Sequence, residues 1–179
     1  IVEAERWLKN NKGLEGDKLY SALLDKDWDT SVKSLCNFPD ILFSLSENIE
    51  QTRRLGDAFL LQEEDVMDVV QELREMAYEN DNLKTTKEQK VIVEQNVIRI
   101  EPAVSTLIYV PVYDPLYVYG PWRYPHHRPY YWYCPPTSYG IRYVRFSPPF
   151  FISIGWFSWA WFDWPCTRIY IVNRDACRY

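Results

Sequence analysis

The chain has 179 residues, of which 47% are hydrophobic and 17% aromatic, with a formal net charge of −5 and a pI near 5.1. This length allows one domain with a proper core, or one domain plus an extension, and we favour the second. The acidic pI and the lack of a recognisable binding motif argue against a nucleic-acid-binding protein.

The charge is divided sharply along the chain. Residues 1–101 contain 22 of the 25 acidic and 13 of the 20 basic side chains and net −9, whereas residues 102–179 contain 3 and 7 and net +4. Every basic residue after position 101 is Arg, whose guanidinium stacks well on aromatic rings. We therefore expect these arginines to pack against Tyr and Trp.

Residues 1–82 are predicted to form a compact unit of short helices. The first helix covers residues 1–10 and ends at an Asn-Asn-Lys-Gly sequence, which is a good stop signal. Asp17 is expected to cap the second helix, and Asp29 or Thr30 the third. Pro39 takes a first-turn position in the fourth, and a fifth helical segment runs through Leu55.

The clearest helix prediction runs from Glu63 to about Glu79. Acidic residues stand at its start, where the helix dipole favours anions. Its apolar side chains recur at the i, i+3, i+4, i+7 spacing of one helix face, namely Val66, Val69, Val70, Leu73, Met76 and Ala77.

Residues 83–120 are predicted to form a small antiparallel sheet that packs on the helices in the same domain. The period of the apolar pattern changes here from 3.6 to 2, and Gln95-Asn96 reads as the turn of a hairpin between residues 91–93 and 97–100. Residues 107–113 are expected to supply the third strand, because a lone hairpin would be marginally stable.

The stretch from Leu107 to Trp122 joins the acidic half to the aromatic half. Pro111 excludes a helix interior and places the strand at an edge or a bulge. Asp114-Pro115 is interpreted as a turn in which the Asp114 side chain accepts bonds from backbone amides. A second extended run is expected over residues 116–119, ending at Gly120.

The pattern YVPVYDP at residues 109–115, followed by VYGPW at 118–122, resembles the signature of an uncharacterised bacterial family, a domain of unknown function found in exported cell-envelope proteins. RWLK at residues 6–9, FPDIL at 38–42 and LGDAFLLQEEDVMDVVQELR at 55–74 support the resemblance in the same order. It covers roughly residues 1–122 and carries over no catalytic or binding residue.

The resemblance implies that the protein is exported, to the periplasm, the outer envelope or the extracellular space. The chain begins at Ile1 without an initiator Met, and we interpret it as a mature or truncated product. The lack of a signal segment is therefore no argument for a cytoplasmic protein.

Residues 121–179 are predicted to form an arm rich in proline and aromatic residues, extended or polyproline-like in its first part. Residues 109–165 contain 10 of the 12 prolines and 21 of the 30 aromatics. The apolar run at 150–164 is too short to span a bilayer as a helix, for which about 20 residues are needed. We expect a strand there, with aromatic rings on both faces, and another short strand over residues 167–172.

The four cysteines have neither CxxC nor CxxCH spacing, which gives no support to a zinc ribbon, thioredoxin chemistry or haem attachment. In an exported protein an even count favours disulfides. We predict the pairs Cys166 with Cys177 and Cys36 with Cys134, and unpaired buried thiols are the alternative.

The candidate binding residues are the aromatic side chains of the arm and of the stretch before it. Such rings offer a large contact area for a partner surface or for sugar rings. They also suit a bilayer interface, or could pack on the protein's own helices. The candidates are Tyr117, Tyr119, Trp122, Tyr124, Tyr130, Tyr131, Trp132, Trp156, Trp159 and Trp161.

Catalytic and metal sites find little support in the sequence. His126 and His127 are the only histidines, and adjacent side chains of an extended chain point in opposite directions, which disfavours joint metal binding. No Ser, Cys and His arrangement matches a known nucleophilic motif. Asp114 is the carboxylate to test for cell-wall hydrolysis, although a capping role explains it as well.

We therefore predict an α+β protein without a cofactor that acts as a non-catalytic structural or interaction module of the cell envelope. The arm is expected to dock on another envelope protein or on a neighbouring copy, with peripheral membrane contact as a possibility and no transmembrane helix. A module that binds peptidoglycan or another polysaccharide is the first alternative, and a cell-wall hydrolase is the second.

Overall fold

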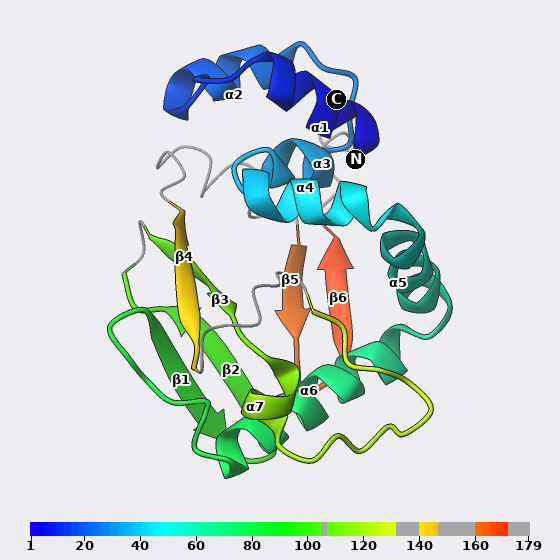
Figure 1. Ribbon diagram of the computed structural model, residues 1–179, viewed down its shortest axis with the longest axis vertical. Helices are drawn as coiled ribbons and strands as arrows, with labels where there is room; N and C mark the ends of the chain where they lie inside the picture. The colour runs from blue at the N-terminus through cyan, green and yellow to red at the C-terminus, as the bar shows by residue number, and fades with distance from the viewer. Residues whose placement is uncertain (105–106, 132–139, 147–159, 172–179) are drawn as a thin grey trace. The chain divides into compact units, whose positions relative to one another are not determined.

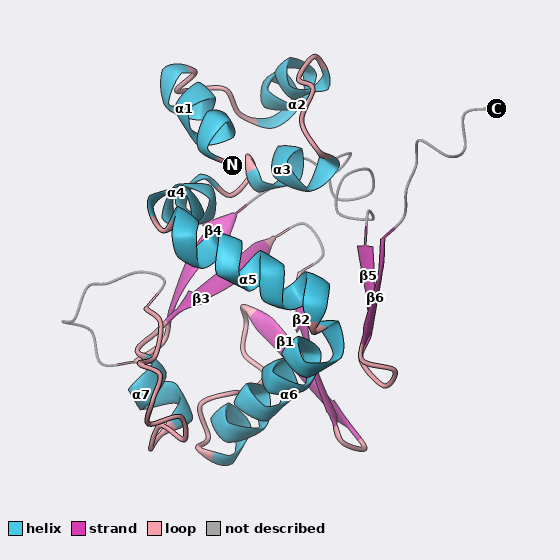
Figure 2. Ribbon diagram, turned by 90° about the vertical axis from the view of Figure 1, so that its right-hand side faces the viewer, coloured by secondary structure: helices cyan, strands magenta, loops and turns pink. Residues whose placement is uncertain are grey.

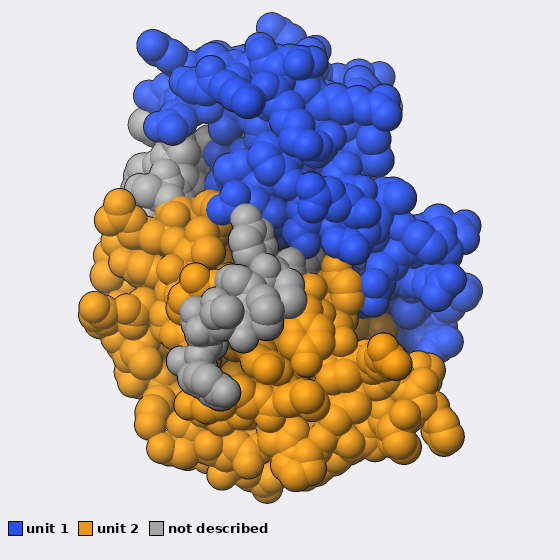
Figure 3. Space-filling model, viewed as in Figure 1, with its two compact units in different colours: residues 1–63, 147–179 blue, residues 64–146 orange. Residues whose placement is uncertain are grey.

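The computed structural model describes residues 1–104, 107–131, 140–146 and 160–171. The chain divides into two compact units, residues 1–63 with 147–179 (unit 1) and residues 64–146 (unit 2) (Figure 3). Helices come first in the chain and small antiparallel sheets follow (Figure 1), which confirms the predicted α+β class. The predicted domain boundaries near residues 82 and 120 stay a prediction.

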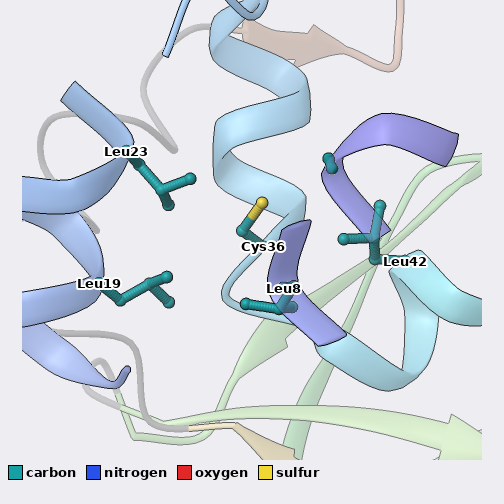
Figure 4. Close-up of a cluster of buried hydrophobic side chains, with 6 residues drawn as sticks. Leu8, Leu19, Leu23, Cys36 and Leu42 are labelled. Atoms are coloured by element: carbon teal, nitrogen blue, oxygen red, sulfur yellow. The ribbon is translucent and has the colours of Figure 1, made fainter. Parts of the chain in front are cut away.

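Five helices make up the N-terminal part of unit 1. They are α1 (Val2–Asn10), α2 (Gly16–Leu24), α3 (Thr30–Leu35), α4 (Pro39–Glu47) and α5 (Ile49–Leu61). Their core consists of Ala4, Leu8, Leu19, Leu23, Cys36 and Leu42, whose side chains converge between the helices in Figure 4. Leu23 and Leu42 are fully buried, and each such side chain contributes about 1.5–3 kcal/mol relative to an exposed one.

The starts of these helices follow the predicted signals in two of three cases. Asp29 Oδ1 accepts a bond from the Ser31 amide at 2.8 Å and caps α3, and Pro39 is the first residue of α4. Asp17 is not a cap, because α2 begins earlier, at Gly16, after an N-cap residue that makes no side-chain bond. Asp17 instead lies in the first turn, where the helix dipole still favours its charge.

Unit 2 begins within α6 (Glu63–Glu79), whose bounds match the prediction. Met76 and Ala77 of the predicted apolar face are buried, whereas Val69 is 42% exposed. Ala77 packs with Leu83, Ile98 and Val118 in a second core cluster. The core of this unit is thus shared between α6, the first hairpin and the stretch that follows it.

The first hairpin pairs β1 (Gln89–Glu94) with β2 (Val97–Pro102), as predicted. Gln95 takes a positive φ of 53° at the turn. The hairpin crosses α6 (Figure 2), and the bonds from Gln71 Nε2 and Arg74 Nη1 to the Ile98 carbonyl measure 3.4 and 2.8 Å. The Ile98 amide in turn donates to Gln71 Oε1 at 2.9 Å. Together these bonds hold the hairpin against α6.

The third strand does not join this hairpin, so this prediction is wrong. β3 (Ile108–Val112) pairs with β4 (Arg142–Phe146) from the arm, with Val110 opposite Val144 (Figure 1). The arm sequence offers β-branched and aromatic residues for this pairing, and the rings of Tyr109 and Tyr143 meet edge to face at 6.4 Å. Each sheet in the described part of the chain has two strands.

Residues 116–119 are helical and not extended, which corrects a second prediction. They lie in α7 (Pro115–Tyr119), where Asp114 Oδ1 accepts a bond from the Leu116 amide at 2.8 Å. Pro115 takes the first helical position, where its missing N–H costs nothing and its fixed φ suits a helix. The Asp-Pro pair therefore starts a helix here.

The last described elements of the arm are the strands β5 (Ala160–Asp163) and β6 (Arg168–Ile171), which form a hairpin in unit 1 and agree with the predicted final strand. Most of the apolar run at 150–164 lies outside the described residues. None of the helices in the described ranges has the length and apolar character that a membrane span requires.

The described cysteines form no disulfide. Cys36 and Cys166 carry free thiols, whereas their predicted partners Cys134 and Cys177 lie outside the described residues. Cys36 is 1% exposed and donates weakly to the Val32 carbonyl at 3.5 Å. It is therefore a small apolar side chain of the core, and burial raises the pKa of its thiol to about 11.

We predict that Cys36 reacts with iodoacetamide only when unit 1 unfolds. Its pKa of about 11 leaves roughly one thiolate in a thousand at pH 8, and burial blocks the reagent. Alkylation of the peptide that contains Cys36, followed by mass spectrometry, should stay near zero in buffer and rise steeply across a urea titration. Cys166, which is exposed, serves as the control. Equal labelling of the two peptides in buffer would contradict the prediction.

Candidate aromatic binding site

The site in unit 2 is built around α7, a helix of one and a half turns that is held by its C-terminal carbonyls. Such carbonyls have no partner inside a helix. Asn82 Nδ2 donates to the carbonyls of Tyr117 and Val118 at 3.0 and 3.2 Å, and Asn80 Nδ2 donates to that of Tyr119 at 3.0 Å. Two amide side chains just after α6 thus anchor the end of α7.

The anchoring of α7 brings two tyrosine side chains into contact. Tyr113 precedes α7 and Tyr119 ends it, and their rings meet edge to face at 5.7 Å with the two hydroxyl oxygens 2.5 Å apart. Burial raises the pKa of Tyr119 well above its ordinary value, and the neighbouring Tyr113 adds to this shift. The Tyr119 phenol is therefore a neutral hydrogen-bonding group at physiological pH.

On one side of this pair lies a groove of about 320 Å³, which we call the Trp122 groove. Its lining combines rings, prolines and aliphatic side chains, and the described lining residues include no carboxylate, thiol or imidazole. They are Leu73, Pro111, Val112, Tyr113, Pro115, Tyr119, Trp122 and Tyr130. A surface of this composition can cover apolar chains or stack on rings, and it presents tyrosine hydroxyls as hydrogen-bonding groups.

The segment after α7 folds over α6 and fixes Trp122. The Trp122 indole N–H donates to the His127 carbonyl at 2.6 Å, and its ring meets that of Tyr124 at 5.3 Å. The Tyr124 hydroxyl donates to Glu72 Oε2 at 2.6 Å. Because that bond favours the neutral phenol, it raises the pKa of Tyr124.

Two ion pairs add to the attachment of this segment. Arg123 lies 3.9 Å from Glu72 and 3.8 Å from Glu79, both on α6. All three side chains are largely exposed, so the pairs add little stability, on the order of 0–1 kcal/mol each. Their effect is to orient the segment, with Trp122 toward the groove.

On the other side of the tyrosine pair lies a cavity of about 230 Å³, which we call the Arg74 cavity. Apolar side chains from α6, the first hairpin, α7 and the start of β4 form most of its wall. The wall also contains Arg74, Tyr113 and Tyr119. The two hollows thus share the tyrosine pair, together with Leu73 and Pro111.

The hairpin of unit 1 presents a second aromatic surface. Trp161 stacks on Tyr170 across the two strands at 4.5 Å, and the two side chains are 53% and 41% exposed. Phe162 points to the opposite face, stacks on Trp164 at 5.2 Å and is 50% exposed. Aromatic rings are therefore open to solvent on both faces of the hairpin.

The predicted binding residues do not form a single site. Tyr119, Trp122 and Tyr130 line the groove, and Tyr124 packs beside Trp122. Tyr117 and Tyr131 are 47% and 39% exposed and line neither hollow, and Trp161 belongs to the hairpin of unit 1. Trp132, Trp156 and Trp159 lie outside the described residues.

Sequence reasoning did not single out Leu73, Arg74 or Tyr113 as site residues. Arg74 carried a usable signal, because it stands four residues after Val70 and three before Ala77, on the side of α6 that packs inward. A charged side chain at an inward register marks a buried polar site. No sequence pattern marked Tyr113, because Tyr119 comes into contact with it only when residues 115–119 form α7.

Asp114 and the histidines have other roles in the structure. The Asp114 carboxylate accepts the cap bond of α7, and Asp114 lines neither hollow. The His127 backbone donates to the Tyr124 carbonyl at 3.0 Å and accepts from Trp122. Within the described ranges, no three His, Cys, Asp or Glu side chains gather closely enough to hold a metal ion.

The chain thus combines an α+β architecture with an aromatic groove in unit 2. The family model described as "Protein of unknown function (DUF3300)" matches residues 1–178, so the chain belongs to this family. This agrees with the predicted resemblance to an uncharacterised bacterial family.

The "Uncharacterized protein YacH" of Escherichia coli (strain K12) is similar to the chain, with 37% identity over 154 residues. The match covers 68% of the chain and 25% of YacH, so the chain spans about a quarter of that relative. No solved structure matches the chain.

We predict that Gly120→Ala loosens the end of α7. Gly120 has φ +69° and ψ −146°, a conformation that is costly for any residue with a Cβ, and that atom would lie 3.1 Å from Asn80 Nδ2. The free energy of unfolding of unit 2 should fall by about 1–3 kcal/mol in urea titrations. Gly56→Ala in α5 is the control, since nothing lies within 4 Å of its added Cβ. That variant should be neutral or up to about 1 kcal/mol more stable. A Gly120→Ala protein as stable as wild type would show that Asn80 does not hold this turn.

Proposed function

We propose that the protein is a non-catalytic interaction module of the bacterial cell envelope that docks on another protein chain through the aromatic residues of its arm. The observation that carries the proposal is the hairpin β5–β6, whose Trp161, Phe162 and Tyr170 are 53%, 50% and 41% exposed. Large exposed rings on both faces of a hairpin are typical of an interaction surface.

Burial of these rings would supply the affinity. Apolar surface removed from water contributes roughly 25 cal/mol per Å², from which the cost of ordering the two partners is subtracted. A two-stranded hairpin is marginally stable alone, so a partner that covers one face would also stabilise the strand pairing. Docking and ordering of the hairpin would then occur together.

The envelope location rests on the sequence. The segments YVPVYDP and VYGPW at residues 109–122 resemble a signature of exported proteins. We propose an exported protein of the periplasm or outer envelope, whose partner is another envelope protein or a neighbouring copy.

Docking through the arm is better tested by point variants than by removal of the arm. Deletion of residues 121–179 would remove β4 and leave β3 without its partner strand, so a truncated chain would not separate docking from folding. Point variants of the hairpin in the full chain avoid this problem.

We predict that Trp161→Ser with Tyr170→Ser weakens self-association at least about tenfold in sedimentation velocity across a concentration series, because aromatic anchors dominate interfaces. The matched control is Leu60→Ser with Leu61→Ser in α5, which removes apolar side chains that are 81% and 80% exposed in the same unit. The control should associate like wild type.

A partner other than a second copy is tested by a photoreactive residue at position 161 of the full chain, expressed in its own envelope. Reproducible cross-links to one protein that disappear in the Tyr170→Ser background would support docking. A chain that is monomeric at every concentration and gives no such cross-link would overturn the proposal.

Glycan binding is the alternative that a specific observation favours. The Trp122 groove places an indole and three tyrosine rings around one hollow, and such platforms stack on sugar rings. A cell-wall hydrolase that acts through Asp114 has no comparable support, because this carboxylate caps α7.

If the protein binds glycan, Trp122→Ala should abolish its co-sedimentation with purified peptidoglycan, because the stacking surface is lost. Tyr78→Ala is the matched control, since Tyr78 is 49% exposed on α6 and lines neither hollow. The bound fraction would be measured over a range of peptidoglycan concentrations. Equal retention of wild type and both variants would exclude the groove as a glycan site.

A further inference from the structure

The Trp122 groove offers few hydrogen-bond acceptors to a ligand. Among the described residues that line it, the side-chain acceptors are the phenol oxygens of the tyrosines. Two of these oxygens, on Tyr113 and Tyr119, already bond to each other. The Trp122 indole N–H is engaged as well, with the His127 carbonyl at 2.6 Å. A ligand rich in N–H or O–H donors would therefore lose more hydrogen bonds to water than the groove returns.

Proline is the residue whose burial in such a groove avoids this loss. It has no backbone N–H, and its ring fixes the backbone before binding, so little conformational entropy is lost. Segments rich in proline form the polyproline II helix and bind to grooves lined by aromatic rings for these reasons. The rings of Tyr113, Tyr119 and Trp122 supply a surface of this kind.

The size of the groove limits the length of the segment. Its volume of about 320 Å³ is near the lower end of the range for ligand sites, which is roughly 300–1,000 Å³. One turn of a polyproline II helix contains three residues and is about 9 Å long. The groove therefore suits a few residues of an extended chain, and not a folded domain.

The charge beside the groove is negative. Leu73 lines the groove from α6, whose sequence contains seven carboxylates and one Arg. Asp114 is exposed and stands in the chain between Tyr113 and Pro115, which both line the groove. Complementary charges attract a ligand and help to select it. A segment with Arg beside its prolines would match this surface.

A segment of the chain itself shows the same chemistry. Residues 121–124 read Pro-Trp-Arg-Tyr and attach to α6, where Arg123 lies 3.9 Å from Glu72 and the Tyr124 hydroxyl donates to Glu72 at 2.6 Å. In a second copy the same segment is held on its own α6 in this way. The occupant of the groove is therefore expected to come from another protein.

We propose that the Trp122 groove binds a short proline-rich segment of another protein, in the polyproline II conformation and with Arg beside its prolines. The prolines pack on the rings of the groove, and the carboxylates of Asp114 and α6 attract the Arg. This proposal is separate from docking through the hairpin, because the hairpin belongs to unit 1 and the groove lies within unit 2.

The test compares two synthetic peptides with capped ends, Pro-Pro-Arg-Pro-Pro-Arg and Ala-Ala-Arg-Ala-Ala-Arg, which have the same charge. Binding to the full chain is measured by calorimetry and by NMR titration. The proline peptide should bind at least about tenfold more tightly than the alanine peptide, because it carries fewer N–H donors and is already extended. Equal affinities, or no binding of the proline peptide up to the millimolar range, would overturn the proposal.

One variant locates the site and another serves as the control. Trp122→Ala should weaken binding of the proline peptide at least about tenfold, because the largest ring of the groove is lost. Tyr117→Ala should bind like wild type, since Tyr117 is 47% exposed on α7 and lines neither hollow. Near-UV circular dichroism checks the fold of both variants. Equal binding by wild type and a folded Trp122→Ala protein would overturn the assignment.

If Trp122→Ala does not fold, the NMR titration of wild type decides the question. The indole N–H signal of Trp122 should shift as the proline peptide is added, whereas that of Trp7 in unit 1 should not. A Trp122 signal that stays in place while the peptide binds would put the peptide elsewhere and overturn the assignment.

Two further measurements separate this proposal from the others. Trp122→Ala should self-associate like wild type in sedimentation velocity, and a loss of self-association would assign the groove to a second copy instead. A protein that binds peptidoglycan through Trp122 but does not bind the proline peptide would overturn the proposal in favour of the glycan alternative.

Discussion

Unit 2 depends on the bonds that two asparagines make to the carbonyls at the end of α7. A helix of five residues has too few internal bonds to be stable alone, because nucleation costs more than so short a helix returns. Asn80 and Asn82 satisfy three of its carbonyls, and burial of Pro115 and Val118 adds the apolar part. Only with α7 in this place do Tyr113 and Tyr119 meet, so both hollows of the unit rest on the same few bonds.

The tyrosine pair forms a common wall between the Trp122 groove and the Arg74 cavity. Protein interiors are close-packed, so a ring that shifts on one side changes the space on the other. The position of these two rings therefore sets the size of both hollows.

The local features of the fold could be read from the sequence, and the long-range ones could not. The spacing of apolar residues predicted α6 with bounds that agree with the structure, and Asp29 and Pro39 started their helices as expected. The Asp114-Pro115 pair is compatible with a turn and with a helix start. The helix forms here, and Val118 is buried in it. The pairing of β3 with β4 links residues far apart in the chain, and no local pattern specifies such a partner. In the candidate site, Trp122 and Tyr130 were found by composition, whereas Arg74 and Tyr113 needed the fold.

Because β3 pairs with β4, unit 2 cannot finish folding until this part of the arm has been synthesised. The strand that pairs with β3 belongs to the arm, so during synthesis β3 is made before its partner and has an open edge in the meantime. Pro111 has no backbone N–H to offer to an added strand, and the two prolines nearest to it, Pro102 and Pro115, bracket the strand. Strands of neighbouring nascent chains would therefore pair poorly with β3. This limits aggregation until β4 has been made.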